Sequence, residues 1–462
     1  MAAYVEDTIA AIATPSGQGA IAILRLSGLD ARAVAGRILR TARGDRELRL
    51  EPEGSHRARR AQLVRPGDSA PIDDVLLVPM WRPRSYTGED TVEIHCHGGR
   101  VIADAALKAA LAAGARAARP GEFTERAYLN GRLDLCQAEA VADMIHAGSE
   151  AALAAARRQL QGDLSAALLR ERDRILDIRA LVEAHLDFPE EDLPAGVQEE
   201  LREATGGVRE RLTGLAATFA RGRLVRDGVR VVLAGKPNVG KSSLLNALLG
   251  RERALVSPEA GTTRDYLEEP LAVGPLQLLL CDTAGIRATD GHVERAGVQR
   301  SEERIAEADV LILVLDGSRP IDEADEALYA PVGGRPLILV RNKCDLAPAW
   351  SPPDMAFGRP CVAVSATRQV GLADLERELE RMVPDAPPAT DGILVTHARH
   401  YEGLIAASHH LADASSLVEG GGALELVAAD LQLACGSLDE LVGRSDNEQI
   451  LDRIFSRFCV GK

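Results

Sequence analysis

Between residue 7 and about residue 120, the chain alternates short apolar runs with polar loops, as β-strands do. The runs at residues 20–24, 75–79 and 91–95 predict strands, and the alanine-rich stretch at residues 102–113 predicts a helix. The opening part of the chain is therefore expected to be a small α/β domain.

The next stretch has a helical pattern. Residues 135–185 are almost unbroken helix formers at helical spacing, and they end in the acidic, proline-bounded segment 187–194. A second helix is expected at residues 197–221. Beyond the stiff proline-rich linker at residues 384–388, further helices are expected at residues 398–419, 423–441 and 448–458.

Between the two helical stretches the pattern changes to buried strands. Apolar runs typical of strands lie at residues 229–233, 276–281, 336–340 and 361–364. Helices are expected at residues 243–248 and 372–382. The fold class is therefore α/β plus all-α, with a P-loop (Ras-like) α/β domain inserted in a helical domain made of two chain segments. The expected domain boundaries are residues 1–121, 122–222, 223–383 and 384–462.

A phosphate-binding pattern follows the first strand of the inserted domain. Gly235 and Gly240 precede Lys241 and Ser242 at the spacing of a loop whose backbone N–H groups surround phosphates. In such loops the lysine reaches the β/γ oxygens and the hydroxyl binds Mg2+. The segment therefore predicts a nucleotide site that includes Asn238, Val239, Gly240, Lys241, Ser242 and Ser243.

Three later motifs follow other strands of this domain. Asp282 stands where a carboxylate can hold Mg2+ through water, and Gly285 can approach the γ-phosphate. Asp345 can accept hydrogen bonds from N1–H and the exocyclic amine of guanine, an arrangement that adenine does not offer. A backbone N–H of the third motif is available for guanine O6, so the motifs together predict GTP. Their other members are Thr283, Ala284, Asn342, Lys343, Ser365, Ala366 and Thr367.

The segment around the second motif bears on hydrolysis. Thr263 can give Mg2+ a second hydroxyl that is released with the γ-phosphate. Ile286 occupies the position where small signalling GTPases carry a water-orienting glutamine, so another group must hold the water. Glu294 is a candidate for that task, and a solvated charge is the alternative. Asn238 is a candidate ligand for a monovalent cation that takes the place of an arginine finger.

Composition limits the expected location of the protein and the partners that it can bind. Seven cysteines without paired short spacings indicate neither a disulfide framework nor a zinc site. The sequence has no membrane-length apolar run and no signal-peptide pattern, so a cytoplasmic protein without membrane contact is expected. A net charge of −15 argues against general nucleic-acid affinity, but arginines form two clusters that either meet a polyanion locally or are simply solvated. The clusters are Arg57, Arg59, Arg60 and Arg65, and Arg221, Arg223, Arg226 and Arg230.

Motifs outside the nucleotide site carry a resemblance to a known family. They include ATPSGQG at residues 13–19, YTGED at residues 86–90, PGEFT at residues 120–124 and FCVGK at residues 458–462. Over essentially its whole length the chain resembles the tRNA modification GTPase (MnmE/TrmE) family.

The resemblance implies a potassium-activated GTP hydrolase that works with a flavoprotein partner, MnmG (GidA), in a heterotetramer. Together such proteins add an aminomethyl or carboxymethylaminomethyl group to C5 of the wobble uridine, position 34, of certain tRNAs. The one-carbon unit is implied to come from 5,10-methylenetetrahydrofolate or 5-formyltetrahydrofolate. The N-terminal domain of such proteins binds the folate and forms a homodimer.

The resemblance also implies roles for single residues. Glu294 matches the water-activating position, and Ser242 and Thr263 match the Mg2+ positions. The K+ positions are matched by Asn238, Ser257, Glu259 and Thr262. The folate positions are matched by Arg25, Glu93, Lys462 and Arg132, the last of which is lysine in some members. Cys459 is implied to act near the folate, although its residue type alone suggests a packed thiol.

Two other functions stay open from the residues. A ribosome-assembly or RNA-binding GTPase switch without covalent chemistry would share the phosphate loop, but the sequence shows no KH-type signature. A purely mechanical dimerising GTPase would use the helices alone. Folate binding to the first 120 residues would separate all three functions.

Overall fold

The computed structural model describes residues 7–15, 17–44, 46–68, 70–186, 195–252, 268–274, 276–282, 307–329, 336–350, 355–382, 392–445, 448–456 and 458–462. The chain divides into two units, and each is described by itself. Unit 1 comprises Met1–Ile145, Gln159–Thr213 and Glu402–Lys462, and unit 2 comprises His146–Arg158 and Gly214–Tyr401.

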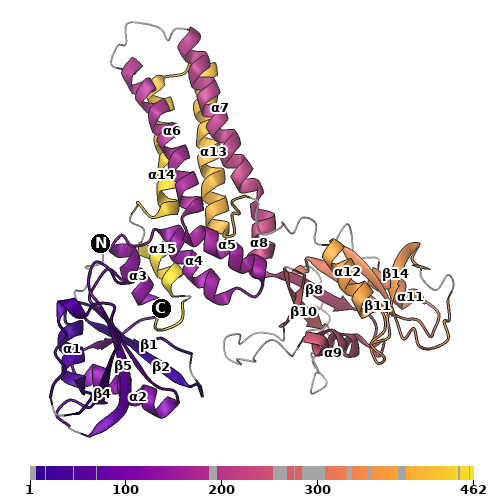
Figure 1. Cartoon of the computed structure of the whole chain (residues 1–462). Helices are drawn as coiled ribbons and strands as arrows, with labels where there is room; N and C mark the ends of the chain where they lie inside the picture. The colour runs from indigo at the N-terminus through magenta and orange to yellow at the C-terminus, as the bar shows by residue number, and fades with distance from the viewer. Residues whose placement is uncertain are drawn as a thin grey trace, which may run out of the picture. The chain divides into compact units, whose positions relative to one another are not determined.

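A seven-stranded mixed sheet opens unit 1, in the order β3-β4-β5-β6-β2-β1-β7 (Figure 1). Neighbouring strands are antiparallel except β1 and β7, which are parallel. The strands are β1 (Ile9–Ile12), β2 (Ile21–Ser27), β3 (Leu39–Thr41), β4 (Arg59–Val64), β5 (Pro71–Met80), β6 (Thr91–His97) and β7 (Arg116–Ala117). Helices α1 (Ala31–Ile38) and α2 (Arg100–Ala112) contribute to the core of this sheet.

Side-chain alternation decides which face of this sheet is buried. Leu24, Ile94 and Leu77 lie opposite one another on β2, β6 and β5, and all three are fully buried. The residues between them point to the opposite face, as the two-residue period of a strand requires. The three predicted strands and the predicted helix of this part are confirmed.

The rest of unit 1 is helical. Its helices include α3 (Glu122–Leu129), α4 (Leu135–His146), α6 (Asp163–Leu186), α7 (Ala195–Ala217), α13 (Ala398–Glu419), α14 (Leu424–Val442) and α15 (Glu448–Phe455). Helix α6 packs along α14 (Figure 1), and Gln198 of α7 donates to the Val418 carbonyl of α13 over 2.5 Å. Two stretches far apart in the sequence therefore build one helical bundle.

The expectation of one nearly unbroken helix over residues 135–185 is wrong. The chain forms α4, α5 (Glu150–Leu160) and α6 instead. A Gly148-Ser149 pair precedes α5, and Gly162, which has a φ of +91°, precedes α6. Glycine at a positive φ is a common helix terminator. The predicted helix at residues 197–221 likewise ends at Ala217 and is followed by α8 (Phe219–Asp227).

Unit 2 contains a second seven-stranded sheet, in the order β13-β14-β12-β11-β8-β10-β9. Strands β8, β10, β11, β12 and β14 are parallel, and β9 and β13 are antiparallel edges. The bounds are β8 (Val229–Ala234), β9 (Glu268–Val273), β10 (Leu276–Asp282), β11 (Val310–Asp316), β12 (Leu337–Asn342), β13 (Met355–Ala356) and β14 (Arg359–Ala363). The associated helices are α9 (Lys241–Glu252), α11 (Glu323–Tyr329) and α12 (Leu372–Met382).

This arrangement is a Ras-like α/β domain, and the four strands predicted from apolar runs are confirmed. Strands β11 and β12 are buried at every residue, as expected of central strands covered on both faces. Among the described helices of the chain, none combines the length and apolar character needed to cross a membrane.

Candidate functional site

The phosphate loop joins β8 to α9 in unit 2. Gly235 has a φ of +148°, and a Cβ there would lie 2.4 Å from the Val314 carbonyl oxygen. Gly240 has a φ of +97°, and a Cβ there would lie 2.2 Å from Asn342 Nδ2. Any other residue would clash at both positions. The loop therefore keeps the bare, tightly curved backbone that phosphate binding requires.

Lys241 begins α9, and its side chain lies in the curve of this loop. Its Nζ donates to the Gly235 carbonyl over 2.7 Å and to the Lys236 carbonyl over 2.8 Å. Ser242 and Ser243 follow in the first turn of α9 and are exposed. A helix N-terminus with an adjacent ammonium group suits a phosphate chain.

Asn342 ties the phosphate loop to the loop after β14. Its Nδ2 donates to the Val239 carbonyl over 2.8 Å, and its Oδ1 accepts from the Ala366 N–H over 3.2 Å. The residue is 2% exposed. One buried amide therefore holds together the two loops that were predicted to bind opposite ends of the nucleotide.

Lys343 adds a second tie. Its Nζ donates to the Asn238 carbonyl over 3.0 Å and pairs with Asp316 Oδ2 at 2.6 Å. Asn238 and Lys343 both have a φ of +64°, an uncommon conformation for residues with a side chain. Such backbone conformations persist only where the surroundings fix them, which these hydrogen bonds do.

Asp345 is the predicted guanine acceptor. The Ser365 hydroxyl hydrogen-bonds its carboxylate and holds the pKa of Asp345 below its usual range. Arg368 lies 3.7 Å from the same carboxylate. The hydroxyls of Ser365 and Thr367 are 3.3 Å apart. Asp345 is therefore ionised at neutral pH and can accept two N–H groups.

Asp282 ends β10 in register with Leu233 of β8, so it reaches the edge of the sheet from which the phosphate loop leaves. The other predicted members of the nucleotide and ion sites lie outside the described residues and stay predictions. They are Ser257, Glu259, Thr262, Thr263, Thr283, Ala284, Gly285 and Glu294.

Two residues of this region were not predicted. Asp316, the partner of Lys343, is the last residue of β11. Its place at a strand end, like that of Asp282, was a signal that could have revealed it. Lys236 of the phosphate loop pairs with Asp322 and, at 2.8 Å, with Asp325 of α11. No feature of the sequence indicated that pair.

A second site lies in unit 1. Arg25 of β2 stands directly opposite Glu93 of β6, with its Nε 2.9 Å and its Nη2 2.8 Å from Glu93 Oε1. Its Nη1 donates to the Gly461 carbonyl over 3.2 Å. The guanidinium carbon lies 5.8 Å from the Tyr86 ring centre and 5.6 Å from that of Phe123. We call this group, with His95, the Arg25 pocket.

Gly461 and Lys462 lie beside Arg25 in this pocket. Gly461 has a φ of +98°, and a Cβ there would lie 2.5 Å from the Ile12 carbonyl oxygen. The Phe123 N–H donates to the Lys462 carbonyl over 3.3 Å. Burial, followed by the nearby charge of Arg25, lowers the pKa of Lys462. Three of the four predicted folate positions, Arg25, Glu93 and Lys462, thus gather in one place.

His95 provides a test of whether this pocket fits a polar cofactor. Its Nε2 is buried, lies 3.6 Å from Glu93 Oε2 and has no hydrogen-bond partner among the described residues. Buried polar atoms are normally satisfied, so a ligand with a hydrogen-bonding group fits here. Arg132 and Cys459 are both exposed, and no described contact joins either of them to Arg25 or Glu93.

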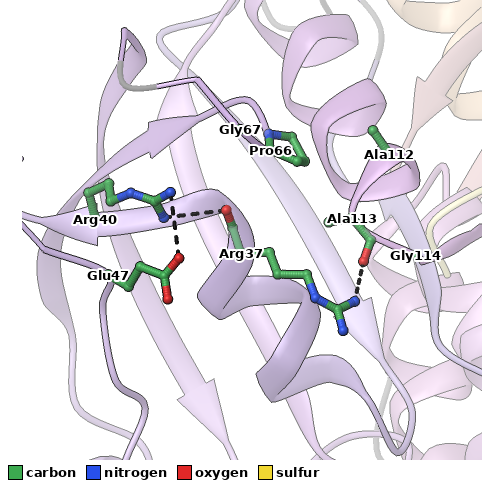
Figure 2. Close-up of a pocket in the computed structure, with 8 residues that line it drawn as sticks. All are labelled: Arg37, Arg40, Glu47, Pro66, Gly67, Ala112, Ala113 and Gly114. Atoms are coloured by element: carbon green, nitrogen blue, oxygen red, sulfur yellow. Dashed lines mark hydrogen bonds and ion pairs between the residues drawn. The ribbon is translucent and has the colours of Figure 1, made fainter.

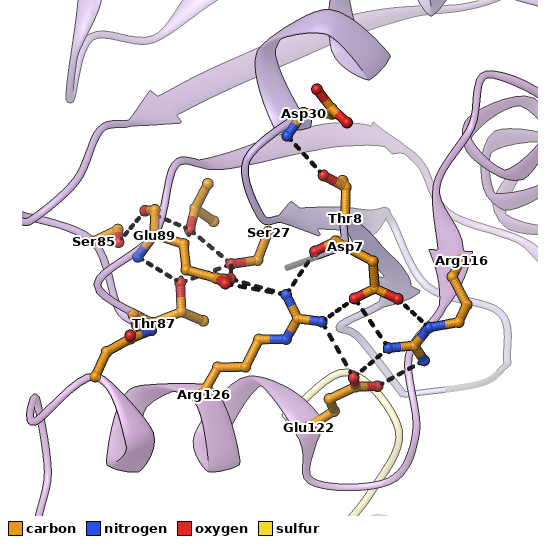
Figure 3. Close-up of polar contacts among 12 residues, drawn as sticks. Asp7, Thr8, Ser27, Asp30, Ser85, Thr87, Glu89, Arg116, Glu122 and Arg126 are labelled. Atoms are coloured by element: carbon orange, nitrogen blue, oxygen red, sulfur yellow. Dashed lines mark hydrogen bonds and ion pairs between the residues drawn. The ribbon is translucent and has the colours of Figure 1, made fainter. Parts of the chain in front are cut away.

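A network of ion pairs is centred on the buried guanidinium of Arg126 (Figure 3). Arg126 donates to the Asp7 carbonyl over 2.8 Å and lies 3.1 Å from Glu89 and 3.3 Å from Glu122. Arg116 bridges the carboxylates of Asp7 and Glu122 at 2.5 Å each. Burial alone would raise the pKa of Glu122, but the hydrogen bonds from Arg116 and from the Arg119 N–H, with the charges of Arg116 and Arg126, together outweigh burial, and the pKa falls.

This network fixes the segments that carry the two aromatic rings. Glu89 belongs to the loop of Tyr86, and Glu122 precedes Phe123 in α3. The Tyr86 hydroxyl also lies 2.8 Å from the hydroxyl of Thr124, so loop and helix are joined directly. The rings beside Arg25 are therefore held by segments that these ion pairs and this hydrogen bond join.

Two family descriptions match the sequence. "GTP-binding protein TrmE N-terminus" matches residues 8–132. "MnmE helical domain" matches residues 135–459.

Curated relatives match over the full length. The tRNA modification GTPase MnmE of Geobacter sulfurreducens is 45% identical, with 99% of this chain and 100% of that protein covered. The protein of the same name from Symbiobacterium thermophilum is 46% identical over the same shares. Among solved structures, an Aquifex aeolicus Era variant bound to GDP.AlF4- is 28% identical over 39% of this chain and 66% of that one. Its TM-score of 0.27 is too low to support any argument.

Proposed function

The chain belongs to the MnmE family of tRNA modification GTPases, and from this premise we propose that it is a potassium-activated GTP hydrolase acting with the flavoprotein MnmG (GidA). The pair adds an aminomethyl or carboxymethylaminomethyl group to C5 of the wobble uridine of certain tRNAs. The protein acts as a homodimer within a heterotetramer with MnmG.

One observation carries this proposal: a single chain holds both a guanine-specifying loop system and a separate polar pocket. Asn342 and Asp345 serve the first, whereas Arg25, Glu93 and the unpartnered His95 Nε2 form the second. A GTPase that only switches between conformations needs the first site alone. The second site supports covalent chemistry with a carried one-carbon unit.

In the nucleotide site, the residues position and neutralise GTP. Lys241 and the N-terminus of α9 oppose the charge of the phosphates, and Asp345 accepts the guanine N–H groups. Ser242 and Thr263 would hold Mg2+. Glu294 would orient the attacking water, directly or through a second water, for displacement at the γ-phosphorus. The K+ ligands would be Asn238, Ser257, Glu259 and Thr262.

In the Arg25 pocket, tetrahydrofolate would supply the one-carbon unit when bound. Glu93 pairs with Arg25 through Oε1, and its carboxylate offers acceptors for the N–H donors of a pterin ring. The ammonium of Lys462 and the remaining N–H groups on the Arg25 Nη atoms suit the carboxylates of the folate tail. Arg132 and Cys459 would join the site from exposed positions.

Nucleoside analysis of tRNA from cells that lack the gene tests the function. We expect the C5-modified wobble uridine to disappear and to return when the wild-type gene is restored. Unchanged tRNA would reject the modification role and favour a GTPase switch without covalent chemistry.

A change of salt tests the cation. GTP turnover by the purified protein is expected to fall strongly when K+ is replaced by Na+ at equal ionic strength, because the larger ion fits the proposed oxygen ligands. Equal turnover in both salts would remove the cation from the mechanism.

A further inference from the structure

The first part of unit 1 contains a basic segment that neither site uses. Residues 37–65 hold nine arginines, no lysine and four acidic residues, a net charge of +5 in a chain whose net charge is −15. We propose that this segment binds the phosphate backbone of the tRNA on which the protein acts, an inference that rests on the proposed function. The arginine band is defined as Arg37, Arg40, Arg43, Arg49, Arg57 and Arg65.

The band follows an edge of the sheet. Strand β3 is the terminal strand, and its partner β4 runs antiparallel to it, with Leu39 opposite Leu63. Arg37 therefore lies near the end of β4 that precedes Arg65. The chain beyond β3 turns and runs back along it, since the Leu48 N–H donates to the Leu39 carbonyl over 3.2 Å. The arginines are thereby spread along one edge rather than gathered at a point.

A cavity of about 560 Å³ opens at one end of the band (Figure 2). Arg37 Nη1 donates to the Ala113 carbonyl over 2.6 Å, and Arg40 Nη1 donates to the Leu39 carbonyl over 3.1 Å. These bonds hold both guanidinium groups on the cavity wall and leave other N–H donors of each for a ligand. Guanidinium groups held in this way match the oxygens of a phosphate.

One acidic residue, Glu47, also lines this cavity. Its Oε1 lies 3.8 Å from Arg40 Nη2, and its side chain is 75% exposed. An ion pair this long and this exposed is weak, so a phosphate competes with it at little cost.

The remaining members of the band are free of carboxylates. Arg43, Arg49, Arg57 and Arg65 are exposed, and no acidic group among the described residues lies within ion-pair distance of them. The second arginine cluster of the sequence differs. Its ion pairs are Arg223 with Asp309, Arg226 with Asp227 and Arg230 with Glu307. Three of the four arginines of that cluster are thus paired with carboxylates of the protein, whereas the charge of the band is available to a partner.

The simpler explanation for these arginines is protection of a sheet edge, because charged side chains discourage pairing with another strand. That role needs charge on β3 itself. Arg57 and Arg65 flank β4, lie outside both β3 and the segment that runs back along it, and add nothing to the protection of that edge. An extended row of guanidinium groups instead suits a polymer with regularly spaced phosphates.

The test compares two variants with equal loss of charge in the full-length protein. The band variant carries Arg43→Gln, Arg49→Gln and Arg65→Gln, and the control carries Arg100→Gln, Arg170→Gln and Arg209→Gln at other exposed positions. The affinity for a tRNA transcript is measured between about 50 and 200 mM KCl. We expect the band variant to bind at least about tenfold more weakly and to lower the slope of log K against log salt by about 2.

The control is expected to bind within about twofold of wild type, and both variants keep wild-type GTP hydrolysis. Equal weakening in both variants would show a general charge effect and overturn the proposal, as would no weakening in either. Loss of binding to phosphatidylglycerol vesicles with unchanged tRNA binding would overturn it in favour of a lipid surface. The nucleoside analysis of the gene deletion is a separate readout, so failure of the band leaves the modification role standing.

Discussion

The nucleotide site and the Arg25 pocket are built in opposite ways. The nucleotide site uses loops that follow successive parallel strands, where β8, β10 and β12 end at one edge of a sheet. The Arg25 pocket joins residues from distant parts of the chain, and Arg25 and Gly461 are 436 positions apart. The first site depends on the conformation of local backbone segments, whereas the second depends on contacts between residues far apart in the sequence.

Because of this difference, single substitutions should affect the two sites differently. In the nucleotide site, the backbone provides much of the binding surface, so single side chains with unique chemistry should carry the largest effects. In the Arg25 pocket, side chains from neighbouring strands contact one another. The loss of one side chain should therefore lower folate affinity only moderately, because the other side chains remain.

Lys241→Ala should produce the largest effect. The ammonium is the only described side-chain charge inside the curve of the phosphate loop, and its loss should lower GTP turnover by about a thousandfold. Phosphate release measures this. Binding of 5-formyltetrahydrofolate should be unchanged, and a parallel loss of folate binding would mean that the two sites are not independent.

Asp345→Asn should come next. An amide offers one acceptor and one donor where guanine needs two acceptors, so GTP affinity should fall by about a hundredfold or more. Xanthosine triphosphate presents a carbonyl at the changed position and should bind the variant better than GTP does. Competition binding with both nucleotides measures the switch, and a variant that still prefers GTP would contradict this assignment.

Arg25→Ala should have a moderate effect confined to the pocket. Glu93 loses the two guanidinium nitrogens that contact its Oε1, and folate affinity should fall by about tenfold to thirtyfold. Arg25→Lys is the matched control, because it keeps the charge but not the fork. Calorimetry should show that wild type binds 5-formyltetrahydrofolate most tightly, the Arg25→Lys variant less tightly and the Arg25→Ala variant least tightly. GTP turnover should be equal in all three.

Acid should have the smallest effect, on the ion network around Arg126. Hydrogen bonds from Arg116 hold the pKa of Asp7 below 3.8, and the pKa of Glu122 lies below 4.5 despite its burial. Their contribution to stability is therefore complete above about pH 4.5 and is lost as pH falls through the lowered folded-state values. Thermal unfolding should show a fall of a few degrees between about pH 5 and pH 3.

Arg116→Gln is the control for this titration. It removes the guanidinium that lowers both pKa values, so the variant should be less stable at neutral pH and should lose less on acidification. An unchanged acid profile would show that the network does not set this dependence.

Much of unit 2 could be predicted from the sequence because its signals are local. Helix α12 begins and ends at the predicted residues. The motif residues Asn342 and Asp345 lie at a strand end as expected. What the sequence did not reveal is the tie from Asn342 to Val239, because a hydrogen bond across 103 positions leaves no periodic trace.

Unit 1 was less predictable for two physical reasons. Strands β1, β3 and β7 have four, three and two residues, too few to show a two-residue period. The pairing of Arg25 with Glu93 depends on strand register, which local propensity does not specify. These residues were found through resemblance to a family, and their spatial meeting was established only by the structure.

The dependence of the Arg25 pocket on residue 461 sets the order in which the protein becomes competent during synthesis. At about 5 to 20 residues per second, the ribosome needs roughly 20 to 90 seconds to pass from Arg25 to Gly461. Throughout that interval the N-terminal sheet can fold, but the Gly461 side of the Arg25 pocket has not yet been synthesised. A nascent or prematurely terminated chain can therefore form the nucleotide site while its Arg25 pocket is incomplete. GTP hydrolysis alone does not report whether the whole molecule is intact.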